Sequence, residues 1–158
     1  MSLIAPGTPV PAFTLRREDF TDFTREDLLG QTTVLVFYPH AFSPGCTDQL
    51  QVYEEAVEDL RAEGATLYGV STDSVWAQKA FRENLGITIE QLSDFEPKGA
   101  TARGFGAYAE AKGTARRALV IVDPDGIVRF SHAAVSPGEV PGVGLIFDGL
   151  AEIRSTPA

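Results

Sequence analysis

The stretch TVLVFYPHAFSPGC, residues 33–46, decides the fold of this chain. Its first part, Thr33–Tyr38, is apolar on both faces, which is typical of a strand buried in the middle of a sheet. The strand is expected to end at Pro39. Ser43-Pro44-Gly45-Cys46 then predicts a helix start, because serine is a preferred N-cap and proline is tolerated at the first helical position. Cys46 is therefore expected at the third position of that helix.

Strand and helix patterns alternate through the rest of the chain. Helices are expected over residues 47–63, 74–85, 98–105 and 143–154, and strands over 66–71, 89–94, 118–122 and 127–132. The turn signal Asp123-Pro124-Asp125-Gly126 predicts a β-hairpin between the last two strands. Crossover helices imply parallel central strands. The expected fold is α/β and thioredoxin-like, a central mixed sheet flanked by helices, with an N-terminal extension (Pro6–Leu29) of extra short strands.

Length and charge limit the classes of function. The 158 residues suit one domain over residues 1–158. The net charge of −9 opposes nucleic-acid binding. The N-terminal residues lack the pattern of a signal peptide and the apolar runs are strand-sized, so we expect a soluble cytoplasmic protein without a membrane partner. Two histidines and one cysteine offer no metal-ligand spacing, and neither a metal nor a cofactor is expected.

Cys46 is the one sulfur nucleophile of the chain. Unpaired N–H groups and the positive dipole end of a helix favour the thiolate, the form of cysteine that attacks peroxide oxygen. If Ser43 caps the helix, its hydroxyl and the Cys46 sulfur share one small pocket, where the hydroxyl can donate to the thiolate or hold a substrate oxygen. The apolar ring of Pro39 would limit water around the sulfur. The alternative is that Cys46 is only a small buried hydrophobe.

The spacing Pro39-x-x-x-Ser43-x-x-Cys46 resembles the signature of the peroxiredoxins, the alkyl hydroperoxide reductase/thiol-specific antioxidant family. The segments 7–15, 34–38 and 92–94 also look like that family. The resemblance implies an antioxidant thiol peroxidase that reduces hydrogen peroxide and organic hydroperoxides through a sulfenic acid on Cys46, with no cofactor. Pro39 and Ser43 would belong to its active site.

The family also uses an arginine at the start of a late strand. Arg117 is the matching residue, and because successive strand residues point to opposite faces, its neighbour Arg116 cannot face the cysteine as well. Gln49 stands where the family often has a glutamate, so an amide would replace an ionic bridge to the arginine. His40 is expected at the rim of the pocket.

The chain lacks the second, resolving cysteine of many peroxiredoxins, and one subgroup would place it where this chain has Gln51. It therefore resembles the one-cysteine type, close to alkyl hydroperoxide reductase E, although Ser-Pro-Gly-Cys looks more like the bacterioferritin-comigratory type. An external low-molecular-weight thiol or a thioredoxin- or glutaredoxin-like reductant would have to recycle Cys46. The family often forms homodimers through the segment around Phe95. A disulfide oxidoreductase needs a second thiol, whereas a thioredoxin-fold binding or chaperone-like module with an inert cysteine stays open as the alternative.

Overall fold

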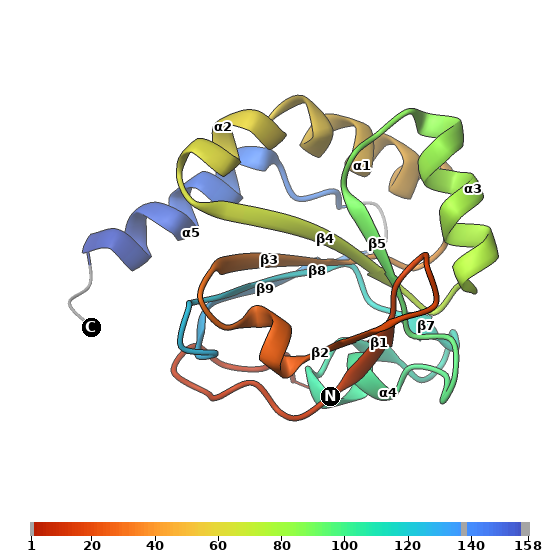
Figure 1. The fold of residues 1–158 in the computed structure, drawn as a ribbon, viewed down its shortest axis with the longest axis horizontal. Helices are drawn as coiled ribbons and strands as arrows, with labels where there is room; N and C mark the ends of the chain where they lie inside the picture. Colours follow the sequence, from red (N-terminus) through yellow and green to blue (C-terminus); the bar gives the residue numbers. More distant parts are fainter. Residues whose placement is uncertain (1, 137–138, 156–158) are drawn as a thin grey trace.

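The computed structural model describes residues 2–136 and 139–155, and within these ranges a seven-stranded mixed sheet forms the centre of the molecule (Figure 1). The strand order is β2-β1-β5-β4-β3-β8-β9. The bounds are β1 Thr14–Arg16, β2 Asp22–Thr24, β3 Thr32–Phe37, β4 Ala65–Ser71, β5 Glu90–Ser93, β8 Ala118–Val122 and β9 Val128–Ala133. β3, β4 and β5 are parallel, while the strands on either side pair antiparallel. The expected mixed sheet and the β8–β9 hairpin are confirmed.

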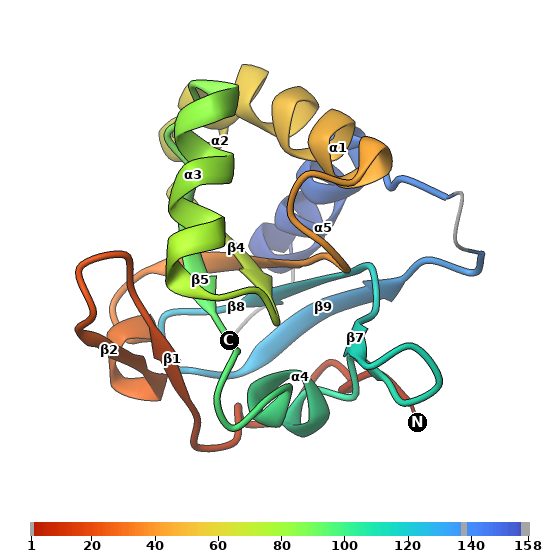
Figure 2. The ribbon, with the colours of Figure 1, turned by 90° about the vertical axis from the view of Figure 1, so that its right-hand side faces the viewer.

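Helices cover both faces of the sheet (Figure 2). On one face lie α1 (Pro44–Glu55), α2 (Val57–Ala62), α3 (Val75–Leu85) and α5 (Val143–Ser155), and on the other lies α4 (Ala100–Gly104). The central strand β3 serves both layers, because its side chains alternate. Val34 and Val36 pack in the cluster beneath the helices, and Leu35 and Phe37 pack in the cluster on the opposite face. All four are fully buried, as the apolar pattern predicts.

The helix expected over residues 47–63 is interrupted. α1 ends at Glu55 and α2 begins at Val57, with Ala56 between them at φ −103° and ψ 2°. The N–H of Ala56 donates to the carbonyl of Tyr53 at 3.1 Å, a tightened i→i−3 turn. After this turn Val57 and Leu60 pack in the same buried cluster as Ala65 and Leu67 of β4. No glycine or proline marks the break, so the sequence predicts one continuous helix here.

The helix α3 has the ends that its sequence predicts. Ser74 is its N-cap, with the side-chain oxygen accepting the N–H of Ala77 at 3.2 Å. Gly86 closes it in the left-handed conformation at φ 67°, which glycine adopts without steric cost. The neighbouring Asp73 does not cap this helix, and its carboxylate accepts the N–H of Ala41 in the loop before α1.

Two short regions complete the fold. The N-terminal extension forms β1, β2 and the 3₁₀ helix η1 (Arg25–Leu28), which confirms the extra short strands. The hairpin of β6 (Tyr108–Ala109) and β7 (Thr114–Ala115) is not apparent in the sequence, because each strand has only two residues. In the described ranges we find no helix with the length and apolar character needed to cross a membrane.

Leu35 provides a test of the two-layer core. Leu35→Ala should lower the free energy of unfolding by about 2–5 kcal/mol, since the side chain is fully buried and its loss leaves a cavity. The matched control is Val52→Ala on α1, an exposed position where the change should stay within about 0.5 kcal/mol. Urea unfolding followed by circular dichroism measures both. Equal midpoints for the two variants would contradict the burial of Leu35.

Candidate active site

Cys46 lies in the first turn of α1, just after the loop that connects β3 to this helix. β3 ends at Phe37, α1 begins at Pro44, and Cys46 is the third residue of the helix, as the sequence predicts. Its side chain is fully buried, and it is a free thiol. The sulfur therefore sits inside the first turn of a helix, where backbone N–H groups have no partner within the helix.

Ser43 is the N-cap residue of α1, but the expected capping bond is absent. The Ser43 hydroxyl donates instead to the carbonyl of His40 at 3.1 Å, and its side chain makes no cap bond to the helix. Ser43 thus occupies the expected N-cap position, but its side chain does not cap the helix. The physical reason is local competition: a serine beside a tight loop can bond to a backbone carbonyl three residues back as readily as to the helix ahead.

The loop between β3 and α1 is held at two points. The N–H of Ala41 donates to the Asp73 carboxylate at 2.9 Å, and that carboxylate also accepts the hydroxyl of Ser71 at 2.7 Å. Phe42 adopts a positive φ of 70° and packs on Phe81 of α3, with ring centroids 5.1 Å apart. A positive φ is unfavourable for a bulky residue, so the loop conformation depends on these contacts.

Arg117 is the residue before β8, and its side chain extends to Cys46. Its Nη1 atom lies 3.6 Å from Cys46 Sγ and donates to Gln49 Oε1 at 2.6 Å. The first turn of α1 is close to the guanidinium, because a Cβ added to Gly45 would lie 3.0 Å from Arg117 Nη2. Arg116 turns the other way and donates to the carbonyl of Gly106 at 3.2 Å. The two arginines, which both precede the first residue of β8, thus have different partners.

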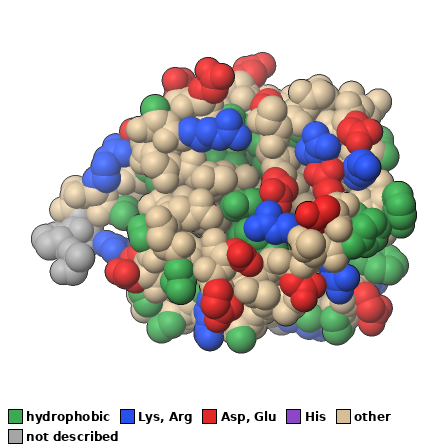
Figure 3. All heavy atoms as spheres, viewed as in Figure 1, with side chains coloured by type: hydrophobic (Ala, Val, Ile, Leu, Met, Phe, Trp, Pro, Cys, Tyr) green, Lys and Arg blue, Asp and Glu red, His purple; other side chains and the backbone are tan. Residues whose placement is uncertain are grey.

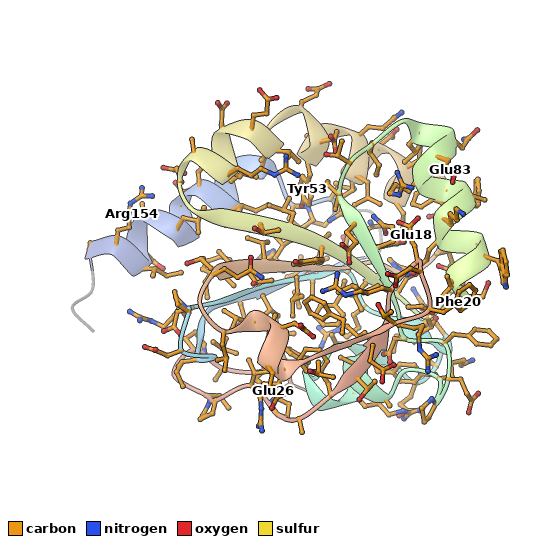
Figure 4. All side chains as sticks on the ribbon, viewed as in Figure 1. Glu18, Phe20, Glu26, Tyr53, Glu83 and Arg154 are labelled. Carbon is orange, nitrogen blue, oxygen red and sulfur yellow. The ribbon has the colours of Figure 1, made fainter. Side chains whose placement is uncertain are left out.

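Gln49 links Arg117 to a residue deeper in the protein, Tyr53. Its Nε2 atom donates to the Tyr53 hydroxyl at 3.1 Å, and that hydroxyl donates to the carbonyl of Pro141 at 2.6 Å. Figure 4 labels Tyr53 between the helical layer and the sheet. Burial raises the pKa of Tyr53 above its ordinary value, although the Gln49 hydrogen bond and the Arg117 charge act against this.

Tyr53 is not apparent as a site residue in the sequence, because Leu50, Tyr53, Val57 and Leu60 follow one another at helical spacing and form an apolar helix face. The available signal was its spacing: Tyr53 follows Gln49 by four residues, so the two polar groups meet on one helix face.

A groove of about 600 Å³ opens beside Arg117. Pro39 and His40 form part of its rim, His40 being exposed, and the β6–β7 hairpin forms a wall. Cys46 is not among the lining residues. One donor of the guanidinium, Arg117 Nε, is buried without a hydrogen-bond partner among the described residues. A buried donor of this kind is costly unless a water or a ligand satisfies it.

The remaining candidates lie elsewhere. His132 pairs with Glu139 at 2.8 Å on β9, and Phe105 is fully buried in the core. Phe95 and Trp76 are exposed. Among residues 2–136 and 139–155, no cluster of three or more His, Cys, Asp or Glu side chains is arranged to hold a metal ion.

Comparison with known proteins matches the AhpC/TSA family model to residues 6–131. Alkyl hydroperoxide reductase C of Staphylococcus aureus is 35% identical over 125 residues, which are 77% of this chain and 65% of that protein. The matched region thus spans less than two thirds of this curated relative. The crystal structure of Enterococcus faecalis AhpC superposes with a TM-score of 0.85 at 30% identity and covers 98% of this chain and 94% of that one.

A second solved structure, peroxidoxin BcpB from Mycobacterium tuberculosis, gives a TM-score of 0.80 at 25% identity, covering 98% of this chain and 99% of that chain. These superpositions confirm the thioredoxin-like fold with its N-terminal extension. On the extent of the family match, the chain belongs to the AhpC/TSA family, the peroxiredoxins that its cysteine motif resembles.

Proposed function

We propose that the protein is a thiol peroxidase that reduces hydrogen peroxide and organic hydroperoxides through Cys46. The observation that carries the proposal is the position of Arg117 Nη1, 3.6 Å from a sulfur in the first turn of a helix. A fixed guanidinium and a helix N-terminus both stabilise negative charge, and both are directed at one buried cysteine. Membership of the AhpC/TSA family supports the same chemistry.

In the proposed reaction, the Cys46 thiolate attacks the terminal oxygen of the peroxide. An S–O bond forms, the O–O bond breaks, and the sulfur is oxidised to a sulfenic acid. The second oxygen leaves with the electron pair of the broken bond, takes a proton from solvent, and departs as water or an alcohol. Charge develops on both oxygens in the transition state, so donors fixed around them lower the barrier.

Site roles follow from this reaction. Arg117 would donate to the peroxide oxygens, which is supported by its buried Nε atom without a partner. The Ser43 hydroxyl would turn from the His40 carbonyl to donate to a bound oxygen, and Pro39 would limit water at the sulfur. Gln49 would hold Arg117 in place through its 2.6 Å hydrogen bond. His40 would stand at the rim of the groove.

An external thiol must complete the cycle, because the chain has one cysteine. A first thiol would condense with the sulfenic acid to a mixed disulfide and water, and a second would release Cys46. We propose a low-molecular-weight thiol or a thioredoxin- or glutaredoxin-like protein, which would approach along the groove beside Arg117 and Pro39. A cycle of this kind needs a supply of reduced thiols, so we place the protein in the cytoplasm.

We also propose a homodimer. Three exposed aromatic residues, Phe20, Trp76 and Phe95, surround an apolar groove of about 520 Å³. Figure 3 shows hydrophobic side chains gathered at this edge of the molecule, beside the position where Figure 4 labels Phe20. Large exposed apolar patches on a protein surface commonly mark interaction sites, and aromatic residues are enriched in them.

The substitution Cys46→Ser tests the proposed chemistry. Wild-type protein without reductant should consume one equivalent of hydrogen peroxide and form a sulfenic acid on Cys46, whereas the variant should consume none. Stopped-flow peroxide consumption and mass spectrometry after dimedone trapping measure this, and added dithiothreitol should restore turnover of the wild type alone. Peroxide consumption by the serine variant at the wild-type rate would sink the proposal. A wild-type protein that is alkylated by iodoacetamide but inert to peroxide would favour the binding module.

Arg116, the residue before Arg117, provides a matched control for a substitution of Arg117. Arg117→Lys should lower the second-order rate constant with hydrogen peroxide by about 10²-fold, because an ammonium cannot reproduce the directed donors of a guanidinium. Arg116 lines the same groove but donates to the carbonyl of Gly106 rather than to Gln49, so Arg116→Lys should leave the rate within about threefold of wild type. Single-turnover kinetics compare the two variants. A wild-type rate in Arg117→Lys would show that positive charge alone supports the reaction, and similar losses in both variants would contradict the specific role of Arg117.

Trp76 tests the homodimer. At 69% exposure in the single chain, this side chain should become buried on association, and Trp76→Glu should convert dimers to monomers by adding a charge to an apolar contact. Sedimentation velocity at several protein concentrations measures the assembly. The control is Val135→Glu, at an exposed position outside this aromatic groove. A monomeric wild type, or a dimer that persists in the tryptophan variant, would contradict this interface.

A further inference from the structure

A chain of three hydrogen bonds leads from Arg117 away from the sulfur. Arg117 donates to Gln49, Gln49 donates to Tyr53, and Tyr53 donates to the carbonyl of Pro141, at 2.6, 3.1 and 2.6 Å. Gln49 and Tyr53 are fully buried. Pro141 is also buried and stands two residues before α5. The relay thus joins the residue before β8, one face of α1 and the segment that enters α5.

The direction of every bond in this relay is determined from its far end. The carbonyl of Pro141 can only accept, so it takes the single proton of the Tyr53 hydroxyl. The tyrosine oxygen must then accept from Gln49, which turns the amide nitrogen toward Tyr53 and the amide oxygen toward Arg117. The flipped amide would place two sets of donors, NH₂ and guanidinium, against each other. Arg117 can only donate as well, so Tyr53 and Arg117 require the same orientation of the Gln49 amide, and the Tyr53 hydroxyl fixes it from the side away from Arg117.

Helix geometry places Gln49 and Tyr53 on the same face of α1 as the sulfur of Cys46. Cys46, Gln49 and Tyr53 follow at spacings of three and four residues, so they share one face of α1. The raised pKa of Tyr53 keeps its hydroxyl protonated, so it stays a donor to Pro141 at neutral pH. Since the interior has a low effective dielectric constant, a misdirected amide dipole beside the guanidinium would be costly.

We propose that Tyr53 is a positioning residue for the peroxidase reaction: it orients the Gln49 amide, and the oriented amide holds Arg117 against Cys46. The inference rests on the proposed function of Cys46. It assigns a role to a residue that contacts neither the sulfur nor a substrate. It also explains how a neutral amide can do the work of a carboxylate at this place. A carboxylate presents oxygen whichever way it turns, whereas an amide needs an orienting partner.

The test is a double-mutant cycle between Tyr53→Phe and Gln49→Glu. Tyr53→Phe removes one hydroxyl and keeps the ring. In the wild-type background it should lower the rate constant of Cys46 with hydrogen peroxide by about tenfold, the scale of one hydrogen bond to a charged group. In the Gln49→Glu background the same change should cost less than about twofold, because either carboxylate oxygen accepts from Arg117.

A purely structural tie between α1 and the segment before α5 gives a different result. In that case Tyr53→Phe would cost the same factor in both backgrounds, and this outcome would overturn the inference. Urea unfolding of all four proteins shows whether each is folded and how much stability the hydroxyl contributes. The loss of rate in the wild-type background should exceed any loss that follows the change in unfolding midpoint.

The same cycle with iodoacetamide separates this inference from the proposed function. Alkylation depends on the thiolate that Arg117 supports, but it involves no peroxide. Coupling between the two substitutions should therefore also appear in the alkylation rates. If wild-type protein is inert to peroxide while the coupling persists in alkylation, the proposed function fails and the relay stands. If peroxide reacts at Cys46 but no coupling appears in either reaction, the relay is wrong.

Discussion

The pairing of β3 with β8 is the constraint on which the site depends. Phe37 stands opposite Ala118 in this antiparallel ladder, so Arg117 is set beside the point where the chain leaves β3 for α1. Cys46 and Arg117 are 71 residues apart in sequence and meet because of this register. Leu119, two residues after Arg117, packs in the buried cluster beneath the helices, which also contains Cys46. A slip of one residue would present Arg116 to α1 instead and would exchange the side chains on the two faces of β8.

Features that reflect backbone periodicity could be predicted from the sequence. The buried strand and the position of Cys46 in its helix follow from alternation and spacing, whereas Arg117 is singled out by the resemblance to the family. Features decided by competing contacts could not. The Ser43 hydroxyl has two acceptable partners, and the choice of the His40 carbonyl depends on the loop. Tyr53 fits an apolar helix face equally well with or without a partner, and Pro141, which gives its hydroxyl direction, lies 88 residues away.

The burial of Cys46 affects how the reactivity of this thiol is explained. Cys46 is fully buried, and a buried thiol in an apolar setting is ordinarily unreactive. Here the first turn of α1 and the guanidinium of Arg117 oppose that effect at the sulfur itself. Burial then becomes useful, because low dielectric strengthens each directed donor around the sulfur. The loop contacts of Ala41 and Phe42 hold the segment before α1 in place, and Ala41 packs against the buried cluster that contains Cys46.

The absence of a carboxylate at Gln49 has a consequence for the charge of the pocket. With glutamate at this position the guanidinium would face two anions, the carboxylate and the thiolate, and their repulsion would oppose ionisation of the thiol. The amide accepts the same hydrogen bond from Arg117 without adding negative charge. In the proposed reaction, the positive charge of Arg117 would then be available to the thiolate and to the peroxide oxygens. The cost is that an amide must be oriented, and in this chain that requirement extends the site through Tyr53 to the entry of α5. The neutral side chain of Gln49 therefore adds no negative charge beside Arg117, and for the same reason it needs the hydrogen bonds through Tyr53 to hold it in orientation.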